Sequence, residues 1–228
     1  MSFGHIRKDF VAPLPPPMID LLRPIDITIP LGSETLLYPG DSAPLIQRVS
    51  AIAEGAMLTA SKVELGCHLG THVDAPAHFL ADGLTLDELG LQHFYGPALV
   101  VDFPRRDRIT PEDLAGLAVP RDRHVLIKTR NSEALHRRAF DPDYCFVTPG
   151  AVRELLERQP LSLGFDYYSL DPLSQEGFPS HLEVARFGIP AFVCLDLKNV
   201  PPGEYTFMAL PLKLPNLEGF PVRAVLFP

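Results

Sequence analysis

The sequence contains no tryptophan and only three cysteines among its 228 residues, at Cys67, Cys145 and Cys194. Because the cysteines are sparse, odd in number and never arranged as CxxC, we expect reduced thiols that pack as small hydrophobic residues. The lack of tryptophan leaves any aromatic stacking on a substrate to tyrosine and phenylalanine. The candidates for such stacking are Tyr38, Tyr167, Tyr168 and Phe178, for each of which packing is the competing role.

Long apolar runs and clusters of positive charge are also missing. No apolar stretch approaches the roughly 18 residues of a membrane-spanning helix. Residues 1–20 lack the continuous apolar segment of a secretory signal. The formal net charge of −8 at pH 7 disfavours nucleic-acid phosphates and anionic lipids as partners. We therefore expect a cytoplasmic protein that binds neither nucleic acid nor membrane.

What is present is typical of a globular protein. Hydrophobic residues make up 46% of the chain and charged residues 21%, so a sizeable core can form. Residues 1–24 are rich in proline, which fixes φ and removes backbone donors, so this stretch should run as an extended arm on the body or on a neighbouring subunit. No repeat or linker follows, and the sequence predicts one domain over residues 25–228.

Short apolar runs predict strands over residues 58–65, 97–103, 124–129, 161–166, 191–197, 204–214 and 222–227. Two Thr-Pro pairs predict helices that begin near residues 111 and 149. Ser180 and Glu183 have the spacing of a capping box, which predicts a helix that begins at His181. The balance favours a strand-rich, mixed α/β fold.

Three histidines and an aspartate fall within eleven residues, at His68, His72, Asp74 and His78. Imidazole and carboxylate bind Zn²⁺ and similar ions such as Mn²⁺. In a straight strand His68 and His72 would stand about 13 Å apart, at roughly 3.3 Å per residue, which is too far for one ion. Gly70 allows the backbone to bend between them. His72 and Asp74 share parity and can face the same way, so the sequence predicts a metal site here.

The same segment, HLGTHVDAPAH from His68 to His78, closely resembles the HxGTHxDxPxH signature of the cyclase family, which includes bacterial kynurenine formamidases. Residues 37–41, 164–172, 210–214 and 219–224 resemble further segments of that family, in the same order. The resemblance therefore covers roughly residues 25–228. It implies the family's swivelling β/β/α fold, a strand-rich mixed sheet or barrel, and assembly as a homodimer or homotetramer.

The resemblance also implies a role for each matching residue. His68, His72 and Asp74 match ligands of a first metal ion, Zn²⁺ or alternatively Mn²⁺. His181 matches a ligand of a second ion, which Asp74 can bridge, and His78 matches the general acid and base. The function implied is hydrolysis of a C–N bond in a small amide, such as N-formylkynurenine, by metal-activated water.

One position departs from the family. Members with two zinc ions place a glutamate about twelve residues after the histidine matched by His181, and this chain has Val193 there. Valine cannot bind a metal, and Asp196 would need a local shift to replace the glutamate. A single-metal hydrolase of cyclic amides or lactones, similar to isatin hydrolases, is therefore an alternative. A non-catalytic metal-binding relative is another.

Two other hydrolase mechanisms fit the sequence less well. No G-x-S-x-G motif is present, so a serine nucleophile on a strand-turn-helix elbow is not expected. Cys67 lies next to His68, but neighbours in an extended chain point to opposite faces, and this layout gives the thiol no partner that would activate it.

Overall fold

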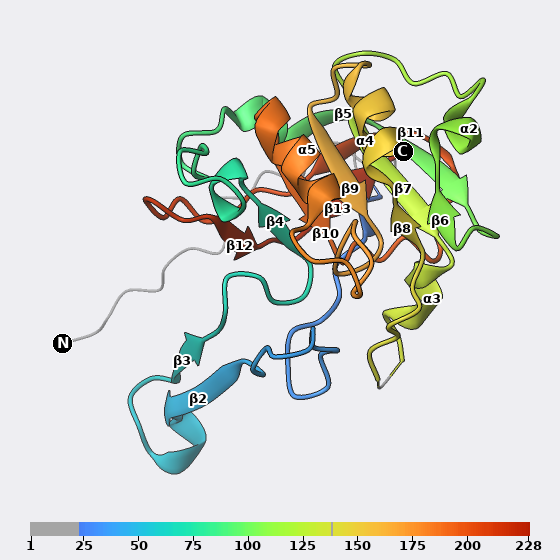
Figure 1. Cartoon of the computed structure of the whole chain (residues 1–228). Helices are drawn as coiled ribbons and strands as arrows, with labels where there is room; N and C mark the ends of the chain where they lie inside the picture. Colours follow the sequence, from blue (N-terminus) through green and yellow to red (C-terminus); the bar gives the residue numbers. More distant parts are fainter. Residues whose placement is uncertain (1–22, 138) are drawn as a thin grey trace.

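The computed structural model describes residues 23–137 and 139–228, and a nine-stranded sheet forms its centre (Figure 1). The strands lie side by side in the order β1-β13-β11-β5-β7-β9-β10-β4-β12. Their bounds are β1 (Ile25–Asp26), β4 (His72–Asp74), β5 (Tyr95–Phe103), β7 (His124–Thr129), β9 (Ser162–Phe165), β10 (Ala191–Val193), β11 (Gly203–Met208), β12 (Gly219–Pro221) and β13 (Val225–Phe227).

The middle of the sheet is parallel and its two sides are antiparallel. β5, β7, β9 and β10 run parallel to one another. β4 and β12 continue the sheet antiparallel on one side, and β11, β13 and β1 continue it on the other. The helices are few and short: α2 (Pro111–Leu114), α3 (Asn131–Ala134), α4 (Pro149–Leu156) and α5 (Pro179–Phe187). This is the strand-rich, mixed α/β fold that the sequence predicts.

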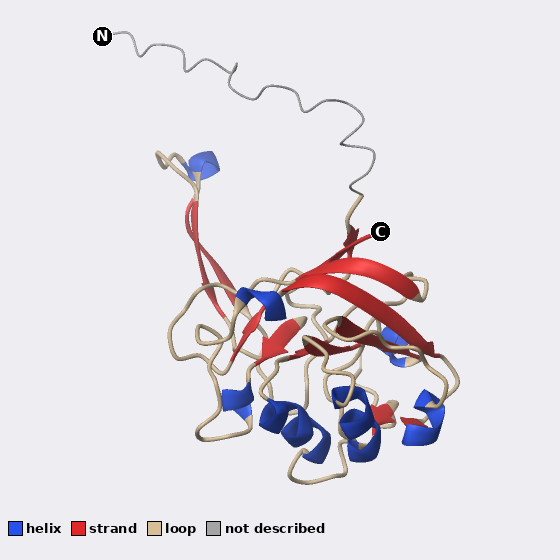
Figure 2. Ribbon diagram, turned by 90° about the horizontal axis from the view of Figure 1, so that it is seen from above, coloured by secondary structure: helices blue, strands red, loops and turns tan. Residues whose placement is uncertain are grey.

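Two apolar cores lie on the two faces of the sheet. One packs residues of α4 and α5 against β7 and β9. Figure 2 shows the two longest helices on the same side of the sheet. The other contains Val73, Phe192 and Phe207. Because side chains alternate along a strand, Val73 in the second core leaves its neighbours His72 and Asp74 facing the side of α5.

Five of the seven predicted strands agree with the structure to within three residues at each end. The strand predicted over residues 191–197 is wrong beyond Val193, because Cys194 takes a left-handed backbone with φ 54° and leaves the ladder. The strand predicted over residues 204–214 is wrong beyond Met208, where the chain enters a loop that contains Pro211 and Pro215, residues without a backbone N–H. The predicted arm over residues 1–24 falls almost wholly outside the described residues.

A separate hairpin projects from the body of the protein (Figures 1 and 2). It consists of β2 (Leu45–Ser50) and β3 (Ala60–Glu64), joined through a short 3₁₀ helix, and only β3 is predicted from the sequence. Its large apolar side chains are more than half exposed: Leu45, Ile46, Val49, Ile52, Met57, Leu58 and Val63. A further small sheet pairs β6 (Arg108–Ile109) with β8 (Phe146–Val147). None of the described helices is long and apolar enough to cross a membrane.

Candidate metal centre

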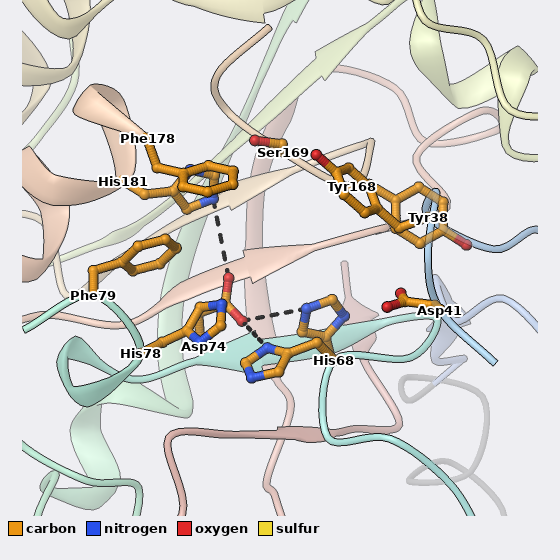
Figure 3. Close-up of a pocket in the computed structure, with 11 residues that line it drawn as sticks. Tyr38, Asp41, His68, Asp74, His78, Phe79, Tyr168, Ser169, Phe178 and His181 are labelled. Atoms are coloured by element: carbon orange, nitrogen blue, oxygen red, sulfur yellow. Dashed lines mark hydrogen bonds and ion pairs between the residues drawn. The ribbon is translucent and has the colours of Figure 1, made fainter. Parts of the chain in front are cut away.

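The short strand β4 forms the floor of a pocket (Figure 3). Its His72 and Asp74 side chains point into this pocket and are 3% and 5% exposed. The register places Asp74 between Ala191 of β10 and Gly219 of β12. Directly opposed residues share a face of the sheet, so two small neighbours leave room for the Asp74 carboxylate.

The chain bends just before β4, as the sequence predicts. Gly70 has φ 64°, a left-handed conformation that costs glycine little. The bend brings His68 back over the strand, where its Nδ1 lies 2.7 Å from Asp74 Oδ1. The rings of His68 and His72 meet edge to face with their centroids 5.2 Å apart. The bend therefore brings His68 and His72 closer together than they would be in a straight strand.

The hydrogen bonds determine which ring nitrogens face the carboxylate. His72 Nδ1 donates to the Gly70 carbonyl at 2.7 Å, which turns His72 Nε2 toward Asp74 Oδ1 at 3.2 Å. His68 therefore offers Nδ1 and His72 offers Nε2 to the same oxygen. Two imidazoles and a buried carboxylate that converge in this way fit a divalent ion such as Zn²⁺ or Mn²⁺. His68, His72 and Asp74 would hold it.

His78 lies beside these residues because the chain turns again. A 3₁₀ helix over Pro76–His78 follows β4 and stacks the His78 ring on His68, with centroids 3.8 Å apart. Ligand atoms of His68, Asp74 and His78 all lie within 4.8 Å of one another. Unlike His72, His78 is exposed to solvent. Its position suits either a ligand or a proton carrier.

The helix that carries His181 does not begin as predicted. α5 begins at Pro179, so His181 is its third residue. The predicted capping box is wrong: the Ser180 hydroxyl donates to a backbone carbonyl of β8, and Glu183 pairs with Arg153 at 2.8 Å. The helix end is capped by a residue from another part of the chain.

That residue is Asp171, which is 1% exposed. It accepts hydrogen bonds from the backbone N–H groups of Ser180 and His181, at 2.7 and 3.1 Å. It also accepts one from His181 Nδ1 at 2.8 Å, which leaves His181 Nε2 directed at the pocket. There it lies 4.0 Å from Asp74 Oδ2. His181 thus approaches the carboxylate oxygen that His68 and His72 do not face.

The position of the expected second-metal glutamate holds an apolar side chain. Val193 pairs with His72 in the sheet, so it shares the face of the site, and it is fully buried. Asp196 pairs with His136 at 3.1 Å instead of lining the pocket. Neither position supplies a carboxylate beside His181 Nε2.

The charges of the cluster shift its proton affinities. Burial raises the pKa of Asp74, but the charges and hydrogen bonds of His72 and His68 outweigh it and hold that pKa well below its usual range. Burial lowers the pKa of His68, but Asp74 and Glu218 raise it by more than burial lowers it, so the pKa of His68 is raised overall. For His78, burial and the neighbouring imidazoles lower the pKa despite the charge of Asp74. His78 is therefore uncharged near neutral pH.

The pocket has a volume of about 210 Å³ and aromatic walls. Among the aromatic candidates from the sequence, Tyr38, Tyr168 and Phe178 line it, whereas Tyr167 is fully buried in a core. Phe79 also lines it and stacks on His181 with centroids 4.8 Å apart. Sequence reasoning missed Phe79, although it directly follows His78.

Two carboxylates near the pocket were also missed. Asp41 lines the pocket, and its only sequence signal is its place in a segment that resembles the family. Glu218 lies 3.3 Å from His68 Nε2, 150 residues along the chain, where no local pattern could indicate it. Burial and the charge of Glu218 also raise the pKa of the Cys67 thiol, which disfavours Cys67 as a nucleophile.

Comparison with known proteins identifies the family of this chain. The model of the Cyclase family matches residues 25–172, and the chain belongs to that family. A structure described as "Potential Metal-Dependent Hydrolase With Cyclase Activity" shares 32% identity at a TM-score of 0.78, over 90% of this chain and 97% of that one. A metal-dependent hydrolase structure from Bacillus stearothermophilus shares 31% identity at 0.78, over 90% and 98%. The fold is that of the Cyclase-family metal-dependent hydrolases.

A third similar structure has a more specific name. Isatin hydrolase A from Labrenzia aggregata, bound to benzyl benzoate, shares 25% identity at a TM-score of 0.80, over 92% of this chain and 94% of that one. These similarities support a hydrolase with a metal site and a small-molecule substrate.

Proposed function

We propose that this protein hydrolyses a C–N bond in a small aromatic amide or lactam with the help of one divalent metal ion. The observation that carries the proposal is the convergence of His68 Nδ1 and His72 Nε2 on the buried Asp74 carboxylate, at 2.7 and 3.2 Å. These three residues would hold Zn²⁺, with Mn²⁺ as the alternative. A metal ion there supplies positive charge that lowers the pKa of water and polarises the amide carbonyl.

His78 is the proposed general acid and base. Its pKa is lowered by burial and by the surrounding imidazoles, so its ring is ready to accept a proton from the attacking water. The same ring then delivers the proton to the leaving nitrogen as the C–N bond breaks. Although its ring is partly desolvated against its neighbours, the residue keeps a surface exposed to solvent, through which it can exchange protons between turnovers.

His181 faces the other side of the same carboxylate. In a two-metal enzyme it would bind the second ion, together with Asp74. In a single-metal enzyme its Nε2, free because Asp171 holds Nδ1–H, would accept a hydrogen bond from a substrate N–H. The burial of Val193 beside His72 favours the single-metal form.

Two substrates represent the proposal. N-formylkynurenine is the open-chain amide, and isatin is the cyclic one. Val193 favours the cyclic substrate because it removes the carboxylate that a second ion needs, and the similarity to an isatin hydrolase points the same way. The aromatic walls of the pocket suit a flat ring in both substrates.

A metal analysis followed by a substrate panel tests the proposal. Purified protein should hold one Zn or Mn ion per chain. It should open isatin faster than it hydrolyses N-formylkynurenine or simple lactones, and a chelator should stop the reaction. Bound metal without turnover across the panel would support the non-catalytic metal-binding relative. Turnover that persists in chelator would contradict a metal mechanism.

We also propose that the chain assembles as a homodimer or homotetramer through its projecting hairpin. A standard interface buries about 800 Å² on each partner, roughly 60% of it apolar. The seven apolar side chains of the hairpin, each more than half exposed, would supply the apolar part of such an interface. Arg48 and Lys62 balance Glu54 and Glu64, so the hairpin is neutral within a chain of net charge −8. Electrostatic repulsion between two negatively charged copies is therefore weakest when they meet through their neutral hairpins.

Light scattering tests the assembly. Ile46 and Val63 oppose each other across the hairpin, so the double variant Ile46→Lys, Val63→Glu adds a cross-strand ion pair and removes apolar surface. The double variant should be monomeric. Leu91→Lys is the control, because Leu91 is an apolar side chain that is 71% exposed and lies outside the hairpin, and this variant should keep the parent mass. An unchanged mass in the double variant would exclude this interface.

Three expectations from the sequence stay predictions: the cytoplasmic location, the extended arm over residues 1–24 and the single domain over residues 25–228.

A further inference from the structure

Glu218 lies beside the proposed metal site and takes no part in the proton transfer described above. Its Oε1 is 3.3 Å from His68 Nε2, while the other ring nitrogen of His68 is 2.7 Å from Asp74 Oδ1. His68 is therefore held between two carboxylates, one at each nitrogen. One carboxylate lies inside the site, and the other lies outside it and is 40% exposed.

The backbone fixes Glu218 to the strand that carries the site. The Glu218 carbonyl accepts a hydrogen bond from the Ala75 N–H at 2.8 Å, directly after β4. The next residue, Gly219, pairs with Asp74 in the sheet. A Cβ at Gly219 would lie 2.4 Å from His68 Cε1, so the imidazole packs directly on the glycine backbone. The His78 ring also stacks on this imidazole.

The three inward-facing histidines differ in the nitrogen that they present. His72 and His181 each donate from Nδ1 to an oxygen, at 2.7 and 2.8 Å, and turn Nε2 toward Asp74. His68 has the reverse arrangement, with Nε2 toward Glu218 and Nδ1 toward the site. Packing holds the plane of the His68 ring, and its hydrogen bonds to Asp74 and Glu218 distinguish this orientation from one turned by 180°, which would direct ring carbons at both carboxylates.

We propose that Glu218 is a positioning residue, which holds His68 so that it binds the metal through Nδ1 while His72 binds through Nε2. The inference rests on the proposed metal site. A metal-binding imidazole commonly gives its other N–H to a carboxylate, which fixes the ring and makes the ligating nitrogen more basic. Loss of such a partner lowers metal affinity by about 10- to 100-fold.

Two substitutions separate the charge of Glu218 from its hydrogen bond. Glu218→Ala removes both and should lower Zn²⁺ affinity by about 10- to 100-fold. Glu218→Gln keeps an oxygen that can accept a hydrogen bond from His68 but loses the charge. Its Zn²⁺ affinity should therefore lie between those of the parent and Glu218→Ala. Glu204→Ala is the control, because Glu204 is an exposed glutamate on β11, at the other side of the sheet. Its Zn²⁺ affinity should equal that of the parent.

The measurement is a competition for Zn²⁺ against a chelating dye at pH 7, together with thermal unfolding of the metal-free proteins. The proposal requires that the affinities fall while the metal-free proteins unfold at the parent temperature. Equal Zn²⁺ affinity in all variants would overturn it. An affinity loss matched by a lower unfolding temperature would also overturn it, because a merely structural role gives that result.

A zinc-loaded crystal structure gives a second readout. Zinc on His68 Nδ1 with Nε2 toward Glu218 is expected, and zinc on His68 Nε2 would overturn the inference. The outcomes also distinguish this inference from the proposed function. A parent protein that binds neither Zn²⁺ nor Mn²⁺ refutes both, whereas a parent that binds zinc no better than Glu218→Ala refutes only the role of Glu218.

Discussion

Two buried aspartates have opposite surroundings. Asp74 is 5% exposed and Asp166 is 0% exposed. Asp74 faces imidazole rings, whereas Asp166 accepts hydrogen bonds from the backbone N–H and hydroxyl groups of Thr129 and Ser132, at 2.6 to 3.0 Å. Asp166 thereby joins the end of β9 to the end of β7 and the start of α3.

The two carboxyl groups differ accordingly in their proton affinity. Burial raises the pKa of Asp166 to about 6, and the hydrogen bonds from Ser132 and Thr129 only partly offset it. At Asp74 the effect of burial is outweighed by His72 and His68, and the pKa falls well below its usual range. Burial alone therefore does not mark a functional carboxylate. The number and kind of partners separate the two: neutral donors tie Asp166 to its neighbours, whereas two imidazole nitrogens converge on one oxygen of Asp74.

The largest effect that tests this contrast is expected for Asp74→Asn. The variant removes the only charged ligand of the proposed first metal, so Zn²⁺ affinity should fall by more than about 100-fold, beyond the loss typical of an outer partner. Dye competition and hydrolysis at limiting zinc measure it. Asp107→Asn, at a side chain 94% exposed, is the control. Parent affinity in Asp74→Asn would remove the contrast between the two aspartates.

His78→Ala sharpens the contrast by testing a neighbour of Asp74 that we expect to move protons. The rate of hydrolysis should fall by about 10²- to 10⁴-fold, because the proton carrier is lost. Metal content should stay at the parent level, measured on the same sample. If the metal is lost as well, His78 is a ligand, which the 4.8 Å grouping with His68 and Asp74 also permits geometrically.

Asp166→Asn should affect stability and leave the metal unaffected. An amide NH₂ would replace an oxygen that accepts hydrogen bonds from Thr129 and Ser132, so the free energy of unfolding should fall by about 1–3 kcal/mol. Urea unfolding and dye competition measure the two properties. A loss of zinc affinity without a loss of stability would contradict the structural role.

The last test is the pH dependence of the stability of the metal-free protein. The pKa of Asp166 in the folded protein, about 6, lies above the usual aspartate value of 3.8. Its contribution to stability is therefore present below pH 3.8 and is lost as pH rises through about 6, at about 1.4 kcal/mol per pH unit. Urea unfolding at pH 4, 5 and 6 should show this slope in the difference between the parent and Asp166→Asn. If the difference in unfolding free energy did not change with pH, the pKa of Asp166 would not be raised in the folded protein.

The metal cluster could be predicted from the sequence because its parts are local. His68, His72 and Asp74 lie within seven residues, and the bend between the two histidines is encoded by Gly70. Glu218 could not be predicted, because it comes within 3.3 Å of His68 only when β12 pairs with β4.

The sequence predicted the fold best where burial determines the pattern. β7 lies in the core and has the predicted bounds, His124–Thr129. β2 was missed because its side chains are largely exposed, so no buried face imposes a pattern. The capping box of α5 was wrong because Asp171, ten residues before His181, takes the Ser180 N–H that the Glu183 side chain would have accepted. Such competition between distant residues has no local sequence signal.

The small neighbours of Asp74 have a consequence for how the family can vary. Ala191 and Gly219 lie on either side of the carboxylate, although 28 positions separate them in the sequence. A Cβ at position 219 would meet the His68 ring at 2.4 Å and the Val73 carbonyl oxygen at 2.9 Å, so this position has no room for a side chain. We expect related sequences that keep this histidine and this aspartate to keep glycine at the matching position.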